Sequence, residues 1–433
     1  MKILLLNTNN PFIASGSVAY DLFNKFLEHG NEVRLLVNSY SADYPAGIVS
    51  METRSSARLS NAFNIVKWKW EKLLLLLKLE KKNHTDPNYH FHELSEDKRM
   101  YSTEKILERV DFRPDVVILL FIKNFINSRN IREIHEKTGV PILWVMYDMA
   151  PFTGGCHYAW TCDGYLNSCG SCPGLHSSDP YDITYQNLRF KQNQIGGVNL
   201  HIICGSEWQF RQARASTLFR DLPVHKFLYP VDSSVFKPVD KRETRIRLGV
   251  DPDKRIVFFG STELHHLRKG MTVLLECLKI LKSKIAGTDL ETRILLLVAG
   301  QGIENLRDSL PFEYHYMGYV DNKTGIASAY QAADVYVCPS IEDSGPTMIN
   351  QSVLCGTPVV AFTMGVAPDL VLNGKTGYMA ELGNAEDLAQ GIFEILSLGT
   401  AGYDNLARQC RDTGYRLMHD KDFATKLLSV VQP

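Results

Sequence analysis

The sequence predicts an α/β protein with two domains, each a doubly wound parallel sheet of the Rossmann-like type. The chain has 433 residues, which is more than one hydrophobic core usually holds. Strand-like apolar runs alternate with helical patterns in both halves, as two such sheets require. The hydrophobic fraction of 45% is typical of a globular chain, and the formal net charge of -1 gives no electrostatic reason to expect nucleic acid as a partner.

The first predicted domain covers residues 1–232. It opens with a strand, a loop up to Gly16 and a helix whose apolar residues share one face, and Gly30 ends that helix. Later apolar runs are expected to be parallel strands buried on both faces. The predicted strands are residues 2–8, 32–37, 115–121, 141–147 and 200–204, and the first helix is residues 17–29.

The second predicted domain covers residues 233–415 and follows a linker of turn-forming residues at 231–238. It repeats the order of strand, loop, helix and strand. Its elements are expected as strands at 255–259, 293–299, 314–320, 335–338 and 358–362, a loop at 260–269 and a helix at 270–284. A C-terminal helix, 416–433, is expected to cross back to the first domain. Because ligands of doubly wound sheets bind beyond the carboxyl ends of the strands, the cleft between the domains is the expected site.

A charged segment, about residues 51–103, is predicted to be a helical insertion in the first domain. Within it, residues 68–82 combine two tryptophans, a leucine block and several lysines. One interpretation is a helix that packs on the first sheet. The alternative is a helix in the headgroup layer of a membrane, which favours Trp and Lys beside an apolar face.

The sequence contains no apolar run of about 18 residues, the length that spans a bilayer. Its first residues are expected to form a buried strand rather than a signal peptide. We therefore expect a cytoplasmic protein, with peripheral contact at the inner face of the membrane if the second interpretation of residues 68–82 holds.

The most informative motif lies at residues 338–362. A strand ends at Cys338, a loop carries Glu342 and Asp343, and a helix is expected to start near Pro346. Backbone N–H groups at a helix N-terminus bind phosphate, and a carboxylate just before them can bind sugar hydroxyls. The motif resembles the donor-site signature of the family 4 retaining glycosyltransferases, whose GT-B fold has two Rossmann-like domains facing a cleft. The resemblance covers nearly the whole chain and is most specific between residues 255 and 379.

This resemblance implies a hexosyltransferase that moves a sugar from a UDP or GDP type donor to a saccharide acceptor. In relatives that build surface polysaccharides, the acceptor is often lipid-linked. The family is usually assigned a front-face attack in which the leaving phosphate acts as base, so neither a side-chain nucleophile nor a catalytic metal is expected. Arg268 and Lys269 would neutralise the leaving diphosphate, and Glu342 would receive hydroxyls of the transferred sugar.

The resemblance also implies a set of residues around the donor and the reacting sugar. The residue Asp148, which follows a strand and precedes a Thr-Gly-Gly turn, would lie near the transferred sugar together with Tyr147. The implied donor-binding residues are Gly16, Ser17, Ser261, Gly302, Gly318, Tyr319, Val320, Asp343, Ser344, Gly345, Pro346 and Asn350.

Several positions depart from the family pattern, including the single Gly16 where the family often has two glycines. Asn350 stands where the family has a second Glu for the ribose hydroxyls, and Tyr147 replaces a His. Ser261 and Thr262 occupy the place of an upstream Arg. Asn and Tyr can still bond hydroxyls, without charge. The alternatives at these positions are a structural amide at 350, a turn cap at Asp148 and a solvated basic turn at 268–269. Two other functions also stay open, a sugar-binding relative without turnover and a nucleotide-sugar epimerase of GT-B fold.

Four cysteines lie within a loop at residues 156–173 with the spacing C-x5-C-x6-C-x2-C. Four thiolates in a loop of a cytosolic chain favour structural zinc, and His157 could replace one of them. Two disulfides, an iron–sulfur cluster or free thiols are the alternatives. Because the loop follows Tyr147 and Asp148 closely, we expect it to shape the acceptor side. The cysteines are Cys156, Cys162, Cys169 and Cys172.

Overall fold

The structure is a computed structural model that describes the chain except residues 13–15, 55–84, 92–94, 346, 419 and 432–433. It forms two compact units. Unit 1 comprises residues 1–203, 212–225 and 427–433, and unit 2 comprises residues 204–211 and 226–426. The candidate interfacial helix at 68–82 and the expected helix start at Pro346 lie outside the described residues. None of the described helices is long and apolar enough to cross a membrane.

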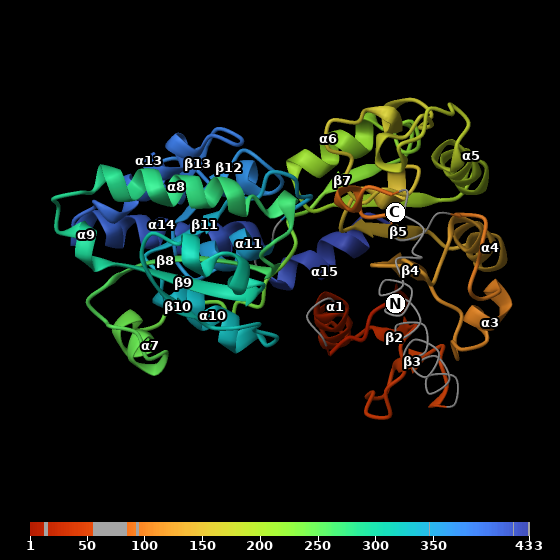
Figure 1. The fold of residues 1–433 in the computed structure, drawn as a ribbon. Coiled ribbons are helices and arrows are strands. Elements are labelled where there is room, and N and C mark those ends of the chain that lie inside the picture. The colour runs from red at the N-terminus through yellow and green to blue at the C-terminus, as the bar shows by residue number, and fades with distance from the viewer. Residues whose placement is uncertain (13–15, 55–84, 92–94, 346, 419, 432–433) are drawn as a thin grey trace. The chain divides into compact units, whose positions relative to one another are not determined.

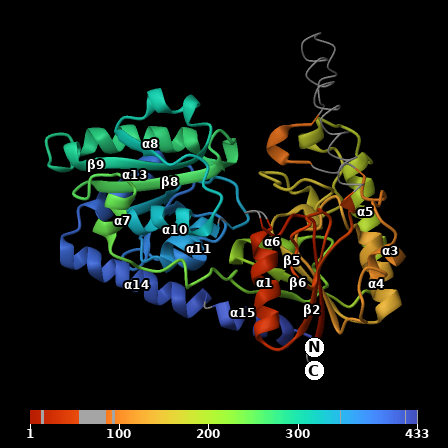
Figure 2. The same cartoon turned by 90° about the horizontal axis from the view of Figure 1, so that it is seen from below.

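Unit 1 is built on a seven-stranded sheet in the order β3-β2-β1-β4-β5-β6-β7. Strand β1 pairs in parallel with β2 and β4. Helix α1 covers one face of this sheet, and α3, α4 and α5 cover the other (Figure 2). The strands are β1 (Lys2–Asn7), β2 (Glu32–Val37), β3 (Ile48–Ser50), β4 (Val116–Leu119), β5 (Ile142–Met146), β6 (Leu200–Cys204) and β7 (Val224–Lys226). The helices are α1 (Ser17–Glu28), α3 (Thr103–Leu107), α4 (Ser128–Thr138) and α5 (Ile183–Ile195), and α6 (Glu207–Ala215) begins in unit 2 and ends in unit 1.

Unit 2 is built on a six-stranded sheet in the order β10-β9-β8-β11-β12-β13, and every pairing in it is parallel. The strands are β8 (Arg255–Glu263), β9 (Ile294–Gln301), β10 (Glu313–Tyr316), β11 (Val335–Cys338), β12 (Val359–Phe362) and β13 (Gly377–Ala380). The main helices are α7 (Lys241–Arg247), α8 (Met271–Lys284), α10 (Lys323–Ala332), α11 (Thr347–Leu354), α13 (Ala385–Leu396), α14 (Thr400–Met418) and α15 (Asp420–Ser429).

Successive side chains of β8 point to opposite faces of the second sheet, and helices bury the apolar side chains on both faces. Val257 and Phe259 belong to a core shared with α8 and α13, whereas Ile256 and Phe258 belong to a core shared with α10, α11 and α14. All four are at most 1% exposed. In Figure 1, α8 and α13 accordingly lie on one side of the sheet, and α10 and α11 lie on the other. The predicted pair of doubly wound sheets is confirmed.

Several boundaries differ from the sequence-based prediction. Strand β8 continues to Glu263, because Gly260 and Ser261 pair with Ala299 and Gly300 of β9 and a bulge follows between Ser261 and Glu263. The residues at 260–263 are therefore strand rather than loop. The predicted C-terminal helix is two helices, because α14 ends at Met418 and α15 begins at Asp420.

Candidate active site

Two loops meet at the carboxyl ends of the adjacent strands β8 and β11 in unit 2. The carbonyl oxygen of Arg268, in the β8–α8 loop, accepts hydrogen bonds from the backbone N–H groups of Ile341 and Glu342, at 2.9 and 3.3 Å. Gly270 follows with φ +68°, and a Cβ placed there would lie 1.8 Å from the carbonyl oxygen of Pro339. Only glycine permits this approach, so the basic loop is fixed against the loop that carries Glu342.

Asp343 joins the two basic side chains. Its Oδ2 accepts hydrogen bonds from Arg268 Nη1 at 3.0 Å and from Lys269 Nζ at 2.5 Å. Burial raises the pKa of the Asp343 carboxyl, but the charges of Lys269 and Arg268 outweigh burial, so the pKa lies below its ordinary value. The Asp343 side chain therefore orients the cations predicted to bind a diphosphate.

The stretch before α11 is buried and contains polar groups. Glu342 is 6% exposed and Ser344 is 4% exposed. The Ser344 carbonyl accepts a hydrogen bond from Ser206 Oγ at 2.8 Å, while its own Oγ has no hydrogen-bond partner among the described residues. A Cβ placed on Gly345 would meet no atom closer than 3.9 Å. A helix N-terminus preceded by small residues is favourable for an anion, because the first backbone N–H groups lack partners within the helix.

Asn350 lies in α11 and is 2% exposed. Its Nδ2 donates a hydrogen bond to the carbonyl oxygen of Tyr229 at 3.2 Å, and its Oδ1 has no hydrogen-bond partner within the described part of the chain. The amide thus has one structural bond and one acceptor that a ligand hydroxyl could satisfy. A carboxylate could not make the bond to Tyr229, which gives a physical reason for Asn at a position where the family has Glu.

We expect Asn350→Glu to lower the stability of unit 2 by about 1–3 kcal/mol, because the hydrogen bond from Asn350 is lost and a buried carboxylate would lie against the Tyr229 carbonyl oxygen. Thermal unfolding measures the effect. Asn405→Glu, at an exposed position of α14, is the matched control and should leave the melting temperature nearly unchanged. If Asn350→Glu is as stable as the control and binds nucleotide diphosphates more tightly, the bond to Tyr229 is not the reason for the amide.

The remaining predicted donor residues of unit 2 lie at the carboxyl ends of β8, β9 and β10, the same edge of the sheet as Lys269. The Ser261 hydroxyl donates to the carbonyl of Glu263 at 3.2 Å. Gly302 and Gly318 have φ values of +91° and +73°, in the left-handed region, and the Gly318 carbonyl accepts from the N–H of Gly300 at 2.9 Å. Tyr319 follows with 46% of its surface exposed, and Val320 comes next in the chain.

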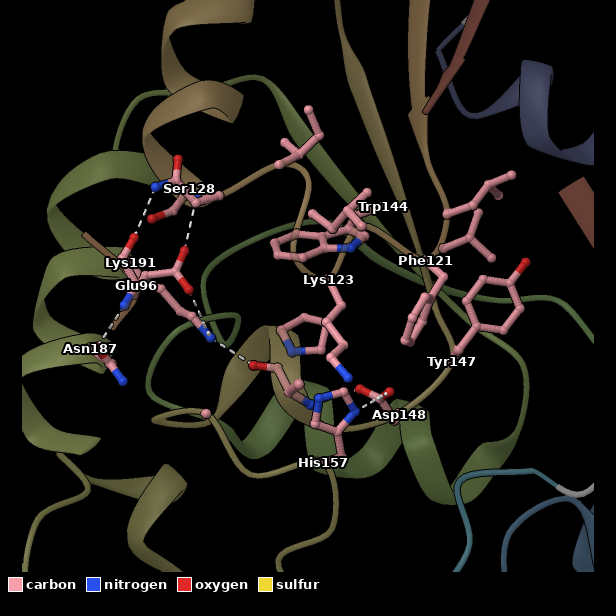
Figure 3. Close-up of a pocket in the computed structure, with 18 residues that line it drawn as sticks. Glu96, Phe121, Lys123, Ser128, Trp144, Tyr147, Asp148, His157, Asn187 and Lys191 are labelled. Atoms are coloured by element: carbon pink, nitrogen blue, oxygen red, sulfur yellow. Dashed lines mark hydrogen bonds and ion pairs between the residues drawn. The ribbon is translucent and has the colours of Figure 1, made fainter. Parts of the chain in front are cut away.

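Unit 1 has a pocket of its own, of about 80 Å³, at the carboxyl ends of β4 and β5 (Figure 3). Asp148 and His157 lie in its wall, where His157 Nδ1 is 2.7 Å from Asp148 Oδ2. Asp148 Oδ1 also accepts the N–H of Ala150 at 2.9 Å, so the carboxylate caps a turn and orients the imidazole. Lys123 extends toward this pair in Figure 3. Trp144 and Phe121 supply an aromatic surface.

Tyr147, which precedes Asp148, lines the same pocket. Burial raises the pKa of its phenol, and the charge of Asp21 raises it further, so the phenol is neutral and can donate a hydrogen bond. Gly16 is the N-cap of α1, and a Cβ there would lie 2.0 Å from the carbonyl oxygen of Asn10. This glycine is therefore required by packing in unit 1. Ser17 begins the helix.

Several polar residues of this pocket are not predicted from the sequence, among them Lys191 and Glu96. Lys191, from α5, is 5% exposed and donates to the carbonyls of Ala150 and Thr153, at 2.7 and 3.0 Å. Its ammonium also lies 3.9 Å from a carboxyl oxygen of Glu96. Lys191 and Glu96 come from segments with no recognisable motif, so no local pattern could have identified them. The sequence predicts His157 only as a metal ligand, whereas in the structure its side chain pairs with Asp148.

The four cysteines line one cavity of about 20 Å³ in unit 1, and none of them is in a disulfide. Cys169, Gly170 and Ser171 all have positive φ, so the chain turns sharply at the C-x2-C pair. The side chain of Asp182 stabilises this turn, because Oδ2 accepts the N–H of Cys172 at 2.9 Å while Oδ1 caps α5. Burial raises the pKa of the Cys169 thiol to about 12.

The cysteine sulfurs are not gathered at the spacing of metal ligands. Over the described residues, the group of three His, Cys, Asp or Glu side chains with ligand atoms within 4.8 Å of one another is Glu263, His265 and His266. The cavity is large enough for one small ion or water, and the cysteine sulfurs would have to move closer together to bind zinc there.

A family model and several curated proteins match part of the second half of the chain. Residues 253–397 match the family model described as "Glycosyl transferases group 1". A D-inositol 3-phosphate glycosyltransferase of Paenarthrobacter aurescens (strain TC1) is 30% identical over 38% of this chain and 41% of its own length. One of the same name from Mycobacteroides abscessus is 29% identical over 41% of this chain and 40% of its own. The chain thus matches less than half the length of these curated relatives.

Solved structures match over nearly the whole chain. A sucrose-phosphate synthase from Thermosynechococcus elongatus aligns with a TM-score of 0.66 and 15% identity, covering 99% of this chain and 98% of that one. HepE of Anabaena, in complex with UDP and glucose, aligns with a TM-score of 0.60 and 16% identity, covering 99% and 98%. These neighbours are GT-B glycosyltransferases. The chain therefore has the GT-B fold, and its residues 253–397 are similar to the group 1 glycosyl transferases.

Proposed function

We propose that this chain is a retaining glycosyltransferase that moves a hexose from a nucleotide-diphosphate sugar to a saccharide acceptor. The observation that carries the proposal is the cluster of Arg268 and Lys269 on buried Asp343, fixed beside Glu342 and the start of α11. Two cations near a helix N-terminus suit a diphosphate, and a buried carboxylate suits the hydroxyls of a sugar.

The chemistry follows from where charge develops. When the bond between the sugar carbon and the phosphate oxygen breaks, the electron pair stays on the diphosphate. Lys269 and Arg268 stabilise that added charge without reorganising, because Asp343 already holds them in place. In front-face attack the acceptor oxygen bonds to the sugar carbon, and its proton passes to the leaving phosphate. The reaction then needs no nucleophile from the chain.

The relatives indicate which donors to test first. HepE has been solved with UDP and with UDP-glucose, and curated relatives are named D-inositol 3-phosphate glycosyltransferases. We propose a UDP sugar as the first donor class and a GDP sugar as the second. We propose that the acceptor uses the pocket of unit 1, where Trp144 and Phe121 offer an apolar surface and Asp148, His157 and Tyr147 offer polar groups. A lipid-linked saccharide in polysaccharide synthesis, at the inner face of the membrane, is the acceptor class that we propose.

A panel of UDP, GDP and ADP sugars tests the function. Release of nucleotide diphosphate is measured with and without saccharide acceptors, and the anomeric configuration of the product is read by NMR. Transfer with retention supports the proposal. Nucleotide-sugar binding without any turnover supports a binding protein, and a changed sugar that is still attached to the nucleotide supports an epimerase. Either of the last two results overturns the transferase.

We also propose that Cys156, Cys162, Cys169 and Cys172 bind a structural zinc ion. The support is that all four line one cavity of the size of a small ion, and that the N–H of Gly164 points to Cys162 Sγ at 3.5 Å. Buried thiols are neutral without a metal, and zinc binding would deprotonate them. Four protein ligands would close the site, so the metal would hold the loop and leave no position for substrate.

Removing the C-x2-C pair should release the zinc. The full chain, purified without added metal, is expected to contain about one zinc per molecule by elemental analysis. The double variant Cys169→Ser, Cys172→Ser should lose that zinc and unfold at a lower temperature, with acceptor use reduced more than donor binding. Cys277→Ala, in α8 of unit 2, is the control and should keep the metal. Metal-free wild-type protein with all four thiols open to alkylation would refute the zinc site.

A further inference from the structure

Glu263, His265 and His266 bring three metal-binding side chains together at the end of β8. One ligand atom from each lies within 4.8 Å of the other two. His266 Nε2 is paired with Glu263 Oε2, and His265 Nε2 lies 3.9 Å from the same oxygen. The two imidazole rings stack with their centroids 5.1 Å apart. Both histidines therefore present a nitrogen to one carboxylate.

The backbone on either side holds this cluster in place. The bulge between Ser261 and Glu263 changes the register of β8 just before the cluster, and the Ser261 hydroxyl bonds the Glu263 carbonyl at 3.2 Å. Leu264 is fully buried, and its N–H donates to the Gln301 carbonyl at 2.9 Å. Gly302 packs beside His265, because a Cβ there would lie 3.4 Å from His265 Nδ1. The three ligands thus project from a backbone that is anchored to β9.

We propose that Glu263, His265 and His266 bind a divalent first-row transition-metal ion. Two imidazoles and one carboxylate are a ligand set that zinc, manganese and iron use in proteins. Because His265 is exposed and the other two are half-buried, the remaining coordination positions face solvent. Water or the oxygens of a phosphate can occupy such positions, as they do at open metal sites.

The place of this site in the loop connects it with the donor, and this second step rests on the proposed glycosyltransferase function. The carbonyl of His266 accepts the N–H of Lys269 at 3.0 Å, so the metal ligands and the basic residues belong to one turn. Ser261 and Thr262 stand just before the cluster, at the position where related enzymes have an arginine. A bound cation would supply positive charge there. A metal in this loop would differ from the metal-free donor site that the family resemblance implies.

Charge predicts that the metal and the diphosphate bind cooperatively. Arg268 and Lys269 already carry two positive charges, of which Asp343 compensates one. A bound divalent ion would add further positive charge to this loop, and the negative charge of a diphosphate would offset it. Each ligand should therefore strengthen the other by the same factor.

Manganese binding to the full chain tests the metal site. Mn²⁺ is followed by electron paramagnetic resonance, because thiolates prefer softer ions and the cysteine loop should not compete for Mn²⁺. The wild type is expected to bind about one Mn²⁺, and Glu263→Gln, His265→Asn and His266→Asn should each weaken binding about tenfold or more. Glu276→Gln and His29→Asn, both exposed and outside the cluster, are the controls. If the wild type does not bind Mn²⁺ at millimolar concentration, the site is overturned. The same holds if the three variants bind Mn²⁺ as tightly as the wild type.

Calorimetry with UDP tests the coupling. The affinity of the wild type for UDP should rise about tenfold with Mn²⁺, and this rise should vanish in His265→Asn. Because Mn²⁺ also binds free UDP, wild type and variant are compared at the same concentrations. If the wild type binds Mn²⁺ but its affinity for UDP rises no more than that of His265→Asn, the metal site stands and its link to the donor is overturned. If Mn²⁺ binds but neither UDP nor any sugar nucleotide does, the transferase proposal fails while the metal site stands.

Discussion

Lys269→Ala is expected to lower kcat by about 100-fold while the fold survives, because one cation that stabilises the departing diphosphate is lost. Lys269 Nζ lies 2.5 Å from Asp343 Oδ2, and Arg268 keeps that carboxylate paired in the variant. The rate of nucleotide release from the best donor of the panel is the measurement. Lys279→Ala, which removes an exposed lysine from α8, is the control and should be fully active.

A second variant separates catalysis from charge balance around Lys269. Removing one partner of a buried ion pair can destabilise a protein, because the other charge is left with less compensation. The double variant Lys269→Ala, Asp343→Asn removes both charges. If the double variant regains wild-type turnover, the loss in Lys269→Ala came from Asp343, and Lys269 has no role in stabilising the leaving group.

Glu342→Gln is expected to lower kcat by about ten- to a hundredfold with a smaller change in the affinity for UDP alone. The substitution keeps the shape of a side chain that is 6% exposed, and it removes only the charge that strengthens a hydrogen bond to a sugar hydroxyl. Turnover and UDP calorimetry are measured on the same protein. Glu304→Gln, exposed after β9, is the control. Equal losses of turnover and UDP affinity would place Glu342 at the nucleotide instead of the sugar.

The fold could be predicted from the sequence because its signals are local. Each central strand is a short apolar run, and each helix has one apolar face, so the order of elements is readable one segment at a time. The three-residue strands β3 and β7 were missed because they are too short to show a period. The sequence predicts that β8 ends at Phe259, but pairing with β9 extends the strand through Gly260 to Glu263, against the local preference of glycine.

The partners within the site could not be predicted, because they depend on loops that are distant in sequence. Lys269 and Asp343 are 74 residues apart, and their pairing depends on the close approach of Gly270 to Pro339. The motif predicts that the backbone N–H of Asp343 binds the donor. In the structure the Asp343 side chain accepts hydrogen bonds from Arg268 and Lys269. The hydrogen bond from Asn350 to Tyr229 likewise joins residues 121 apart. From the sequence, Asn in place of the family's Glu is only a loss of charge, whereas in the structure the amide makes a hydrogen bond that a carboxylate could not make.

The carboxylate of Asp343 also affects which anions this loop can retain. The carboxylate competes with any bound anion for the side chains of Arg268 and Lys269, because it belongs to the chain and lies at hydrogen-bond distance from both. Inorganic phosphate has only its charge with which to compete, whereas a nucleotide sugar adds contacts from its base, ribose and hexose. Free phosphate, which is abundant in cells, should therefore inhibit this protein only weakly.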